Sequence, residues 1–375
     1  RAFDFAVGLR GTMISDRFDW DATISRAEYR VDTKRPRFLA NKLTEYFLGD
    51  QQGFNPYFDA YPQYELNQER FFNPIDAATF QSLNTTLIGK AQSEVTQANF
   101  TVSGDLFELP AGSVGIAAVV EAANQSYKLV ADPRTLPGYT GDEQIYNFSD
   151  TGGGGERDRY AFGLEFSIPI LDTLNASIAG RYDKYSDVTD VDDAVSWQAG
   201  LEWRPLDNLL FRASHGTSFR APDMHYVYAG ESGFFTTVVD EYRCRRDGVN
   251  PLSNACTADA DYAYSVAGVR KGSTTLVEEE GKSTTIGVVW DLNDKMSISA
   301  DWYDIELTGG VDDIFTTYLL REEAACLLGT DRAGGVVDGN SAACQFFTGL
   351  VTRTDSAFRD NQIDSYTSFP VNQSL

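Results

Sequence analysis

Four cysteines are the residues of this chain best suited to forming a specific bond. Cys244 and Cys256 share one long polar segment, and Cys326 and Cys344 share another. Four cysteines allow three pairings, but two local bridges are the simplest because each would staple a loop that has little core of its own. A zinc site is disfavoured, since the chain has no C-x-x-C spacing and only 2 histidines. The pattern predicts two disulfides formed in an oxidising environment.

The other reactive residues form no catalytic arrangement. Neither His215 nor His225 belongs to a Ser-His-Asp order or sits beside paired carboxylates. The run Gly152 to Gly155 has no strand-to-helix context, so it predicts a flexible loop tip rather than a phosphate-binding loop. Acidic clusters such as Asp190, Asp192 and Asp193 predict a solvated, mutually repelling surface, with a loop-bound divalent cation as the weaker alternative. We therefore expect no enzyme activity, no cofactor and no dedicated metal site.

Aromatic side chains gather in one long polar segment of the N-terminal part of the chain. Because aromatic rings present large flat faces that can stack on a ligand, this segment predicts a ligand-binding surface. Sugars and aromatic chelates are the ligands that such rings favour. The residues concerned are Phe54, Tyr57, Phe58, Tyr61 and Tyr64.

The elements that must position these segments are strands with a two-residue period. From Met296 to Tyr303 apolar residues alternate with polar or aromatic ones, and the ranges 160–168, 174–183 and 195–204 repeat the pattern. The apolar faces end in Trp, Tyr or Phe, as at a membrane interface, while the polar faces carry charges and small residues. A soluble sandwich also alternates, but these two details favour an all-β, antiparallel transmembrane β-barrel.

Short and long connections alternate between the strands. Tight turns are expected at 109–112, 171–173, 205–208 and 292–294, where Pro, Gly, Asn and Asp provide the turn geometry. Long connections are expected at about 31–93, 129–156, 220–280 and 309–360. The short link from Ser186 to Asp192 is an exception. This asymmetry predicts periplasmic turns at one end of the barrel and long extracellular loops at the other.

Composition agrees with this architecture. The mean hydropathy is −0.31, and no run approaches the roughly 18 apolar residues of a membrane helix. A barrel needs no such run because only every second strand residue faces lipid. The net charge of −24 disfavours a nucleic-acid partner, since a phosphate-binding surface must be basic.

Charged residues on the polar strand faces would line the lumen of such a barrel. A wet lumen accommodates ionised side chains, and we expect these to pair with one another rather than to contact a ligand directly. The lumen-lining residues are Glu165, Arg181, Asp183, Glu202, Arg204, Arg212 and Asp301.

Several motifs resemble those of one membrane-protein family, in the order that the family shows. The string from Leu209 to Pro222 resembles the strand and corner of TonB-dependent outer-membrane receptors, which end in a Phe-Arg-Ala-Pro motif. Leu276 to Glu279 resembles the family's Leu-x-Pro-Glu element, with Glu278 in place of proline. The remaining matches are Phe219-Arg220-Ala221-Pro222 at the corner itself, Arg181-Tyr182-Asp183, Trp203-Arg204-Pro205 and Asp301-Trp302-Tyr303-Asp304-Ile305.

The resemblance implies a barrel of about 22 strands filled by a plug. It also implies import of a scarce, bulky nutrient across the outer membrane of a Gram-negative bacterium, among its lipids and lipopolysaccharide. The nutrient would be an oligosaccharide, peptide, siderophore or similar chelate. The TonB-ExbB-ExbD complex would supply energy through the plug, which would also contact the lumen-lining charges.

About eleven strands are counted in the chain, roughly half of such a barrel. Residues 1–375 show no plug domain, no TonB box and no closing strand, so we expect an incomplete barrel domain with two open edges. A passive porin-like channel, a surface adhesin and a barrel enzyme are the alternatives. An upstream plug would favour the receptor, whereas strands directly after a signal peptide would favour the porin.

Overall fold

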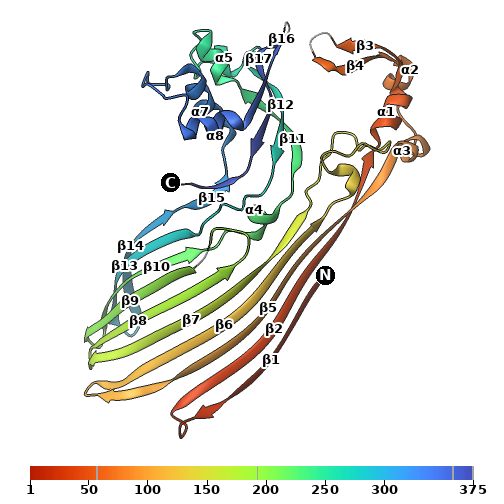
Figure 1. Ribbon diagram of the computed structural model, residues 1–375. Helices are drawn as coiled ribbons and strands as arrows, with labels where there is room; N and C mark the ends of the chain where they lie inside the picture. Colours follow the sequence, from red (N-terminus) through yellow and green to blue (C-terminus); the bar gives the residue numbers. More distant parts are fainter. Residues whose placement is uncertain (56–57, 192, 357–358, 374–375) are drawn as a thin grey trace.

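A single curved sheet dominates the computed structural model, which describes residues 1–55, 58–191, 193–356 and 359–373. Ten antiparallel strands follow the order β1-β2-β5-β6-β7-β8-β9-β10-β13-β14 (Figure 1). This confirms the predicted partial barrel, with ten strands rather than about eleven. The strands are β1 (Ala2–Met13), β2 (Phe18–Phe38), β5 (Asn84–Leu109), β6 (Gly112–Val130), β7 (Gly153–Leu171), β8 (Leu174–Ser186), β9 (Asp193–Leu206), β10 (Leu209–Arg220), β13 (Glu279–Asn293) and β14 (Met296–Thr308).

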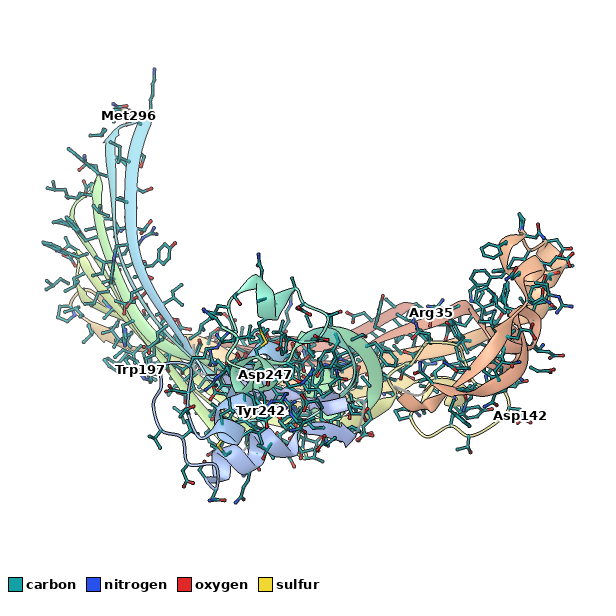
Figure 2. The ribbon with its side chains drawn as sticks, turned by 90° about the horizontal axis from the view of Figure 1, so that it is seen from above. Arg35, Asp142, Trp197, Tyr242, Asp247 and Met296 are labelled. Atoms are coloured by element: carbon teal, nitrogen blue, oxygen red, sulfur yellow. A yellow bond between two sulfur atoms is a disulfide. The ribbon has the colours of Figure 1, made fainter. Side chains whose placement is uncertain are left out.

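The two faces of the sheet differ in chemistry. Residues that are opposite in the register share a face, and the row that joins Phe166, Ile178 and Ala199 is apolar. Seen from above, the sheet follows an open curve, with Trp197 toward its convex side (Figure 2). The apolar face is therefore the outer, lipid-facing one, and the polar face is the inner one.

Aromatic side chains mark both edges of the outer apolar band. Trp203 stacks on Phe211 with ring centroids 5.5 Å apart, near the turns. Toward the other end, Tyr160, Tyr182 and Trp302 are the last large outer-face side chains before charged residues begin. Two such girdles are what a strand crossing a bilayer requires at its two interfaces.

All five tight turns lie at one end of the sheet, along the lower left of Figure 1. The four predicted turns are present, and a fifth at 14–17 has positive φ at Ile14, Ser15 and Asp16. At the opposite end, the connection expected at 31–93 is shorter, spanning 39–83, because β2 and β5 continue to pair up to Phe38 and Asn84. Beyond the lipid band both faces of a strand can be polar. The alternation of apolar and polar residues in the sequence therefore ends before the strands end.

The connection between β2 and β5 forms an arm of small elements, at the upper right of Figure 1. Its hairpin β3–β4 is antiparallel, and helices flank it. None of the helices in the described residues is long and apolar enough to cross a membrane. The elements of the arm are α1 (Ala40–Phe47), β3 (Leu48–Asn55), β4 (Phe58–Leu66), α2 (Gln68–Phe72) and α3 (Ala77–Leu83).

Two later segments fold together into one unit, which we call the cap (residues 232–270 and 310–373). In the cap, β12 pairs in parallel with β17 across nearly a hundred residues of sequence. Its core includes Val266, Leu319 and Tyr366. The cap comprises β11 (Ser232–Val239), α5 (Glu241–Arg246), α6 (Asn254–Thr257), β12 (Ala263–Arg270), β15 (Gly310–Asp313), α7 (Thr316–Leu328), α8 (Ala342–Gly349), β16 (Val351–Ser356), β17 (Arg359–Ser368) and β18 (Pro370–Gln373).

Both predicted disulfides are present in the cap. Cys244 bonds to Cys256 with Cα atoms 5.8 Å apart, and Cys326 bonds to Cys344 with Cα atoms 5.3 Å apart. The first closes the α5–α6 turn, and the second fastens α8 to the end of α7. Each disulfide therefore restrains a polar segment that extends from the small core of the cap. This is the role that was predicted from the position of the cysteines in long loops.

Candidate ligand-binding site on the inner wall

An open hollow of about 940 Å³ lies on the inner face of the sheet, toward the end that carries the cap. We call it the wall pocket. It brings the Phe-Arg-Ala-Pro corner together with polar side chains from β5 to β9. Residues that matter below include Ser93, Glu121, Tyr127, Arg157, Arg159, Arg181, Asp183, Tyr185, Phe219, Arg220, Pro222, Asp223 and His225.

The floor of the wall pocket is a network of two acids and two arginines. Register places Glu121 and Asp183 on either side of Ala161, whose small side chain leaves room for their diagonal neighbours Arg159 and Arg181. Glu121 accepts from Arg159 at 3.2 Å and also from Arg181. Asp183, only 1% exposed, binds Arg181 through both oxygens at 2.7 and 3.0 Å. Such a bidentate, shared arrangement fixes all four side chains.

The Phe-Arg-Ala-Pro corner forms one rim of the pocket through two arginine contacts. Arg157, which is 3% exposed, donates from Nη1 to the carbonyl oxygen of Pro222 at 2.8 Å and pairs with Asp187 at 2.5 Å. Arg220 of the corner pairs with Glu279 at 2.5 Å. Two of the sequence motifs therefore meet, because Glu279 ends the segment that resembles Leu-x-Pro-Glu.

His225 connects the pocket to the cap. It lies on the helix α4 (Met224–Tyr228), where Nδ1 is 2.7 Å from the hydroxyl of Tyr127 and Nε2 is 3.3 Å from Nη1 of Arg270. Arg270 in turn pairs with Asp313 at 2.6 Å. Because an arginine can only donate, Nε2 must accept, so the ring is neutral and Nδ1 carries the proton. Partial burial and the positive charge of Arg270 lower the pKa of His225 accordingly.

The prediction of a flexible loop tip at residues 152–155 is wrong. Gly153 opens β7 with φ +125°, and a Cβ there would lie 2.2 Å from the carbonyl oxygen of Tyr228. A Cβ on Gly155 would lie 2.1 Å from the Tyr228 ring. The run is therefore where α4 packs directly against the backbone of β7, which only glycine permits.

The other expected lumen residues lie on the inner face but outside the wall pocket. Arg212 binds Asp301 through both carboxylate oxygens at 2.8 Å. Glu202 and Arg204 are both more than half exposed and stand 3.9 Å apart. Glu165 lines a neighbouring hollow of about 340 Å³ nearer the turns, which shares Arg181 with the wall pocket. Of the seven residues, the structure brings only Arg181 and Asp183 into the pocket.

The aromatic segment lies on the arm, and the arm contributes nothing to the wall pocket within the described residues. Phe54 is 61% exposed on β3, and Tyr64 is partly exposed on β4. The side chains of Phe58 and Tyr61 lie outside the described residues, as does Tyr57. Further aromatic residues that had not been singled out pack edge-to-face on the arm, namely Tyr46, Phe47, Phe71 and Phe72.

The part of the chain that the structure describes contains no group of three or more His, Cys, Asp or Glu side chains arranged to hold a metal. Asp192, one of the acidic residues considered for a loop-bound cation, lies outside that part.

His225 and Tyr127 were missed as site residues. They stand 98 positions apart, and neither belongs to a motif. Only the long-range packing of α4 on β6 and β7 brings them together.

A curved antiparallel wall with an apolar outer face, a polar inner face and long connections at one end has the architecture of an outer-membrane β-barrel. A family model described as "TonB dependent receptor-like, beta-barrel" matches residues 2–324, and the chain belongs to this family. Proteins of the family are outer-membrane receptors of Gram-negative bacteria that take up ligands and interact with TonB. The family is one of transporters and receptors rather than enzymes.

Solved structures share the fold at low sequence identity. The siderophore receptor PirA from Acinetobacter baumannii matches with a TM-score of 0.51 and 12% identity, over 100% of this chain and 40% of that one. The ferric enterobactin receptor PfeA from Pseudomonas aeruginosa matches with a TM-score of 0.51 and 13% identity, over 84% of this chain and 36% of that one. No curated protein sequence matches the chain. The chain thus spans about two fifths of the length of these receptors.

Proposed function

We propose that the protein containing this chain is a bacterial outer-membrane receptor that imports a bulky nutrient by energy-coupled, gated transport. The wall pocket carries this proposal. Its volume of about 940 Å³ is close to the upper end of known ligand sites, roughly 300–1,000 Å³. It also lies at the capped, extracellular end of the inner wall, where a nutrient arriving from outside would be bound first.

The chemistry of the two faces of the wall indicates which other molecules the protein would contact. Lipid and lipopolysaccharide would surround the outer band and its aromatic girdles. A plug would sit against the inner face, where paired charges such as Arg212 and Asp301 offer polar contacts without a net field. The TonB-ExbB-ExbD complex would act through that plug. The aromatic arm would contact ligand before it reaches the pocket.

Conductance and TonB binding together test this proposal against a passive channel. The whole protein, purified in detergent, is inserted into planar bilayers in KCl, and its binding to the periplasmic domain of TonB is measured separately. We expect no steady conductance, because a plug closes the lumen, and saturable binding of TonB. A constantly open pore with no affinity for TonB would instead support the porin alternative.

A further inference from the structure

We infer that the ligand of the wall pocket is electrically neutral and rich in hydroxyl groups, such as an uncharged oligosaccharide, and is not an anionic chelate. This rests on the proposed receptor function and narrows its substrate class. Three features support it: the balance of charges in the pocket, the mixture of donors and acceptors that the pocket presents, and the tyrosine rings in and beside it.

Each arginine that lines the wall pocket already has a carboxylate partner. Arg159 and Arg181 share Glu121, and Arg181 also holds Asp183. The remaining cations pair outside the floor, Arg157 with Asp187 and Arg220 with Glu279. Four guanidinium groups thus face four carboxylates. Glu121 and Asp183 line the pocket, Asp187 and Glu279 lie outside its lining, and Asp223 is a third acid of the lining.

An anion would gain no net attraction from such a wall. A site that concentrates anions needs an excess of positive potential, and this chain has a net charge of −24. An anion that approached Arg159 or Arg181 would also meet Glu121, which is close enough to both for a direct hydrogen bond. Like charges at such distances repel, and they do so more strongly away from bulk water.

The same network suits hydroxyl groups. The side chains of Arg159 and Arg181 remain 26% and 31% exposed, and that of Glu121 remains 19% exposed. Guanidinium groups can only donate, and carboxylates can only accept, whereas a hydroxyl does both. A polyhydroxylated ligand can therefore bond to both members of the exposed pairs that Glu121 forms with Arg159 and Arg181, without a change in charge.

Tyrosine rings flank the network on the same face. Register places Tyr29 opposite Ser93, and Ser93 opposite Tyr127, so the three form one row on the inner wall. Tyr29 lines an adjoining hollow of about 400 Å³ that shares Ser93 with the wall pocket, and its 57% exposure leaves its ring available for contact. Tyr185 packs edge-to-face on Phe219 at 6.1 Å beside the floor. Rings placed beside paired polar groups offer apolar contact to the C–H faces of a sugar ring.

A glycan array tests the inference on the whole receptor in detergent, with neutral and carboxylated glycans printed together. A soluble ferric tris-catechol complex serves as the anionic chelate. We expect binding to neutral glycans with an affinity that added salt leaves unchanged. Salt-sensitive binding of the ferric complex or of carboxylated glycans would overturn the inference, and so would failure to bind any neutral glycan.

Two matched variants test whether neutral glycans bind at the inner wall. Tyr29→Ala should weaken neutral-glycan binding by about tenfold, or about 1.4 kcal/mol. Tyr146→Ala, which removes an equally exposed ring (56%) from the β6–β7 connection, should leave it unchanged. Equal loss in both variants would contradict the assigned position.

Charge variants test the balance itself. Glu121→Gln leaves the two floor arginines with one fewer carboxylate, so it should create salt-sensitive binding of carboxylated glycans. Glu165→Gln removes an inner-wall acid outside the pocket and should not create such binding.

These binding assays need no energy source. A receptor that binds neutral glycans but conducts steadily and ignores TonB would therefore refute the proposed transport mechanism and leave the ligand class intact.

Discussion

Arg353 illustrates how single residues of the cap depend on one another. It donates to Asp240 at 2.9 and 3.0 Å and to Glu323 at 2.7 and 2.8 Å, and Asp240 also accepts from the hydroxyl of Tyr264 at 2.6 Å. Asp240 and Glu323 are 0% and 2% exposed. Burial raises the pKa of Glu323, although the pairing with Arg353 opposes this shift. Two buried acids therefore share one cation.

Replacing that cation should be costly. Arg353→Met would leave both carboxylates buried without a counter-ion, and we expect the cap to lose about 3–5 kcal/mol. Hydrogen exchange of the β16 and β17 amides measures this loss. The control is Arg321→Met, since Arg321 is 41% exposed, pairs with its neighbour Glu322 and lies over the Tyr318 ring. Its effect should be about 0–1 kcal/mol. Similar exchange in both variants would show that the buried network adds no stability.

His225 should make the link between pocket and cap sensitive to pH. Its pKa is lowered in the folded protein, so the native state binds a proton less readily than the unfolded chain does. The stability that neutral His225 contributes is thus present above the unfolded value of 6.5 and is lost as pH falls through the lower folded pKa. Protonation would place a second cation beside Arg270, although Asp223 and Asp313 would offset part of the repulsion.

The measurement is hydrogen exchange of the α4 backbone amides at neutral and at acidic pH, corrected for the intrinsic exchange rates at each pH. Protection should fall below about pH 6.5 in the natural protein. His225→Gln can still donate to Tyr127 and accept from Arg270, but it does not titrate, so its protection should stay level. An identical pH profile in the variant would assign the effect to another group.

At the scale of elements, the strands have one face for lipid and one for water. Leu201 is 49% exposed on the outer face of β9, whereas Gln198 of the same strand lines the inner hollows. Leu201→Arg should destabilise the barrel by about 1–3 kcal/mol, because the charge would enter the bilayer between its midplane and the girdle that includes Trp203. Gln198→Arg should cost far less. Urea unfolding of the whole protein in lipid compares the two; equal costs would contradict the assigned faces.

The cap shows which elements local patterns do not reveal. β12 and β17 pair in parallel although nearly a hundred residues separate them, and their partners come from two different connections. Strands this short carry no clear period, and loop segments that fold on each other leave no local signal. The disulfides were predictable because cysteine pairing within a loop is a local property.

At the scale of the whole molecule, both edges of the sheet are open. β1 and β14 each pair with a single neighbour within the described chain. Unpaired backbone groups cannot be satisfied in lipid, so residues 1–375 alone should not form a stable barrel. Refolded into detergent, they should give aggregates rather than a monomer that resists SDS at room temperature and shifts on heating. A heat-modifiable monomer would contradict this expectation.

By itself, the sequence determined the antiparallel barrel wall, its lipid-facing residues, its turns, its disulfides and its family. Each of these depends on a period of two, a turn residue or a motif, all of which are local. Only the tertiary structure decided that Glu121, Arg159, Arg181 and Asp183 share one network, and that His225 joins the wall to the cap. Those contacts depend on strand register and on the packing of distant connections. A shift of one residue in register would send each floor side chain to the opposite face of the wall.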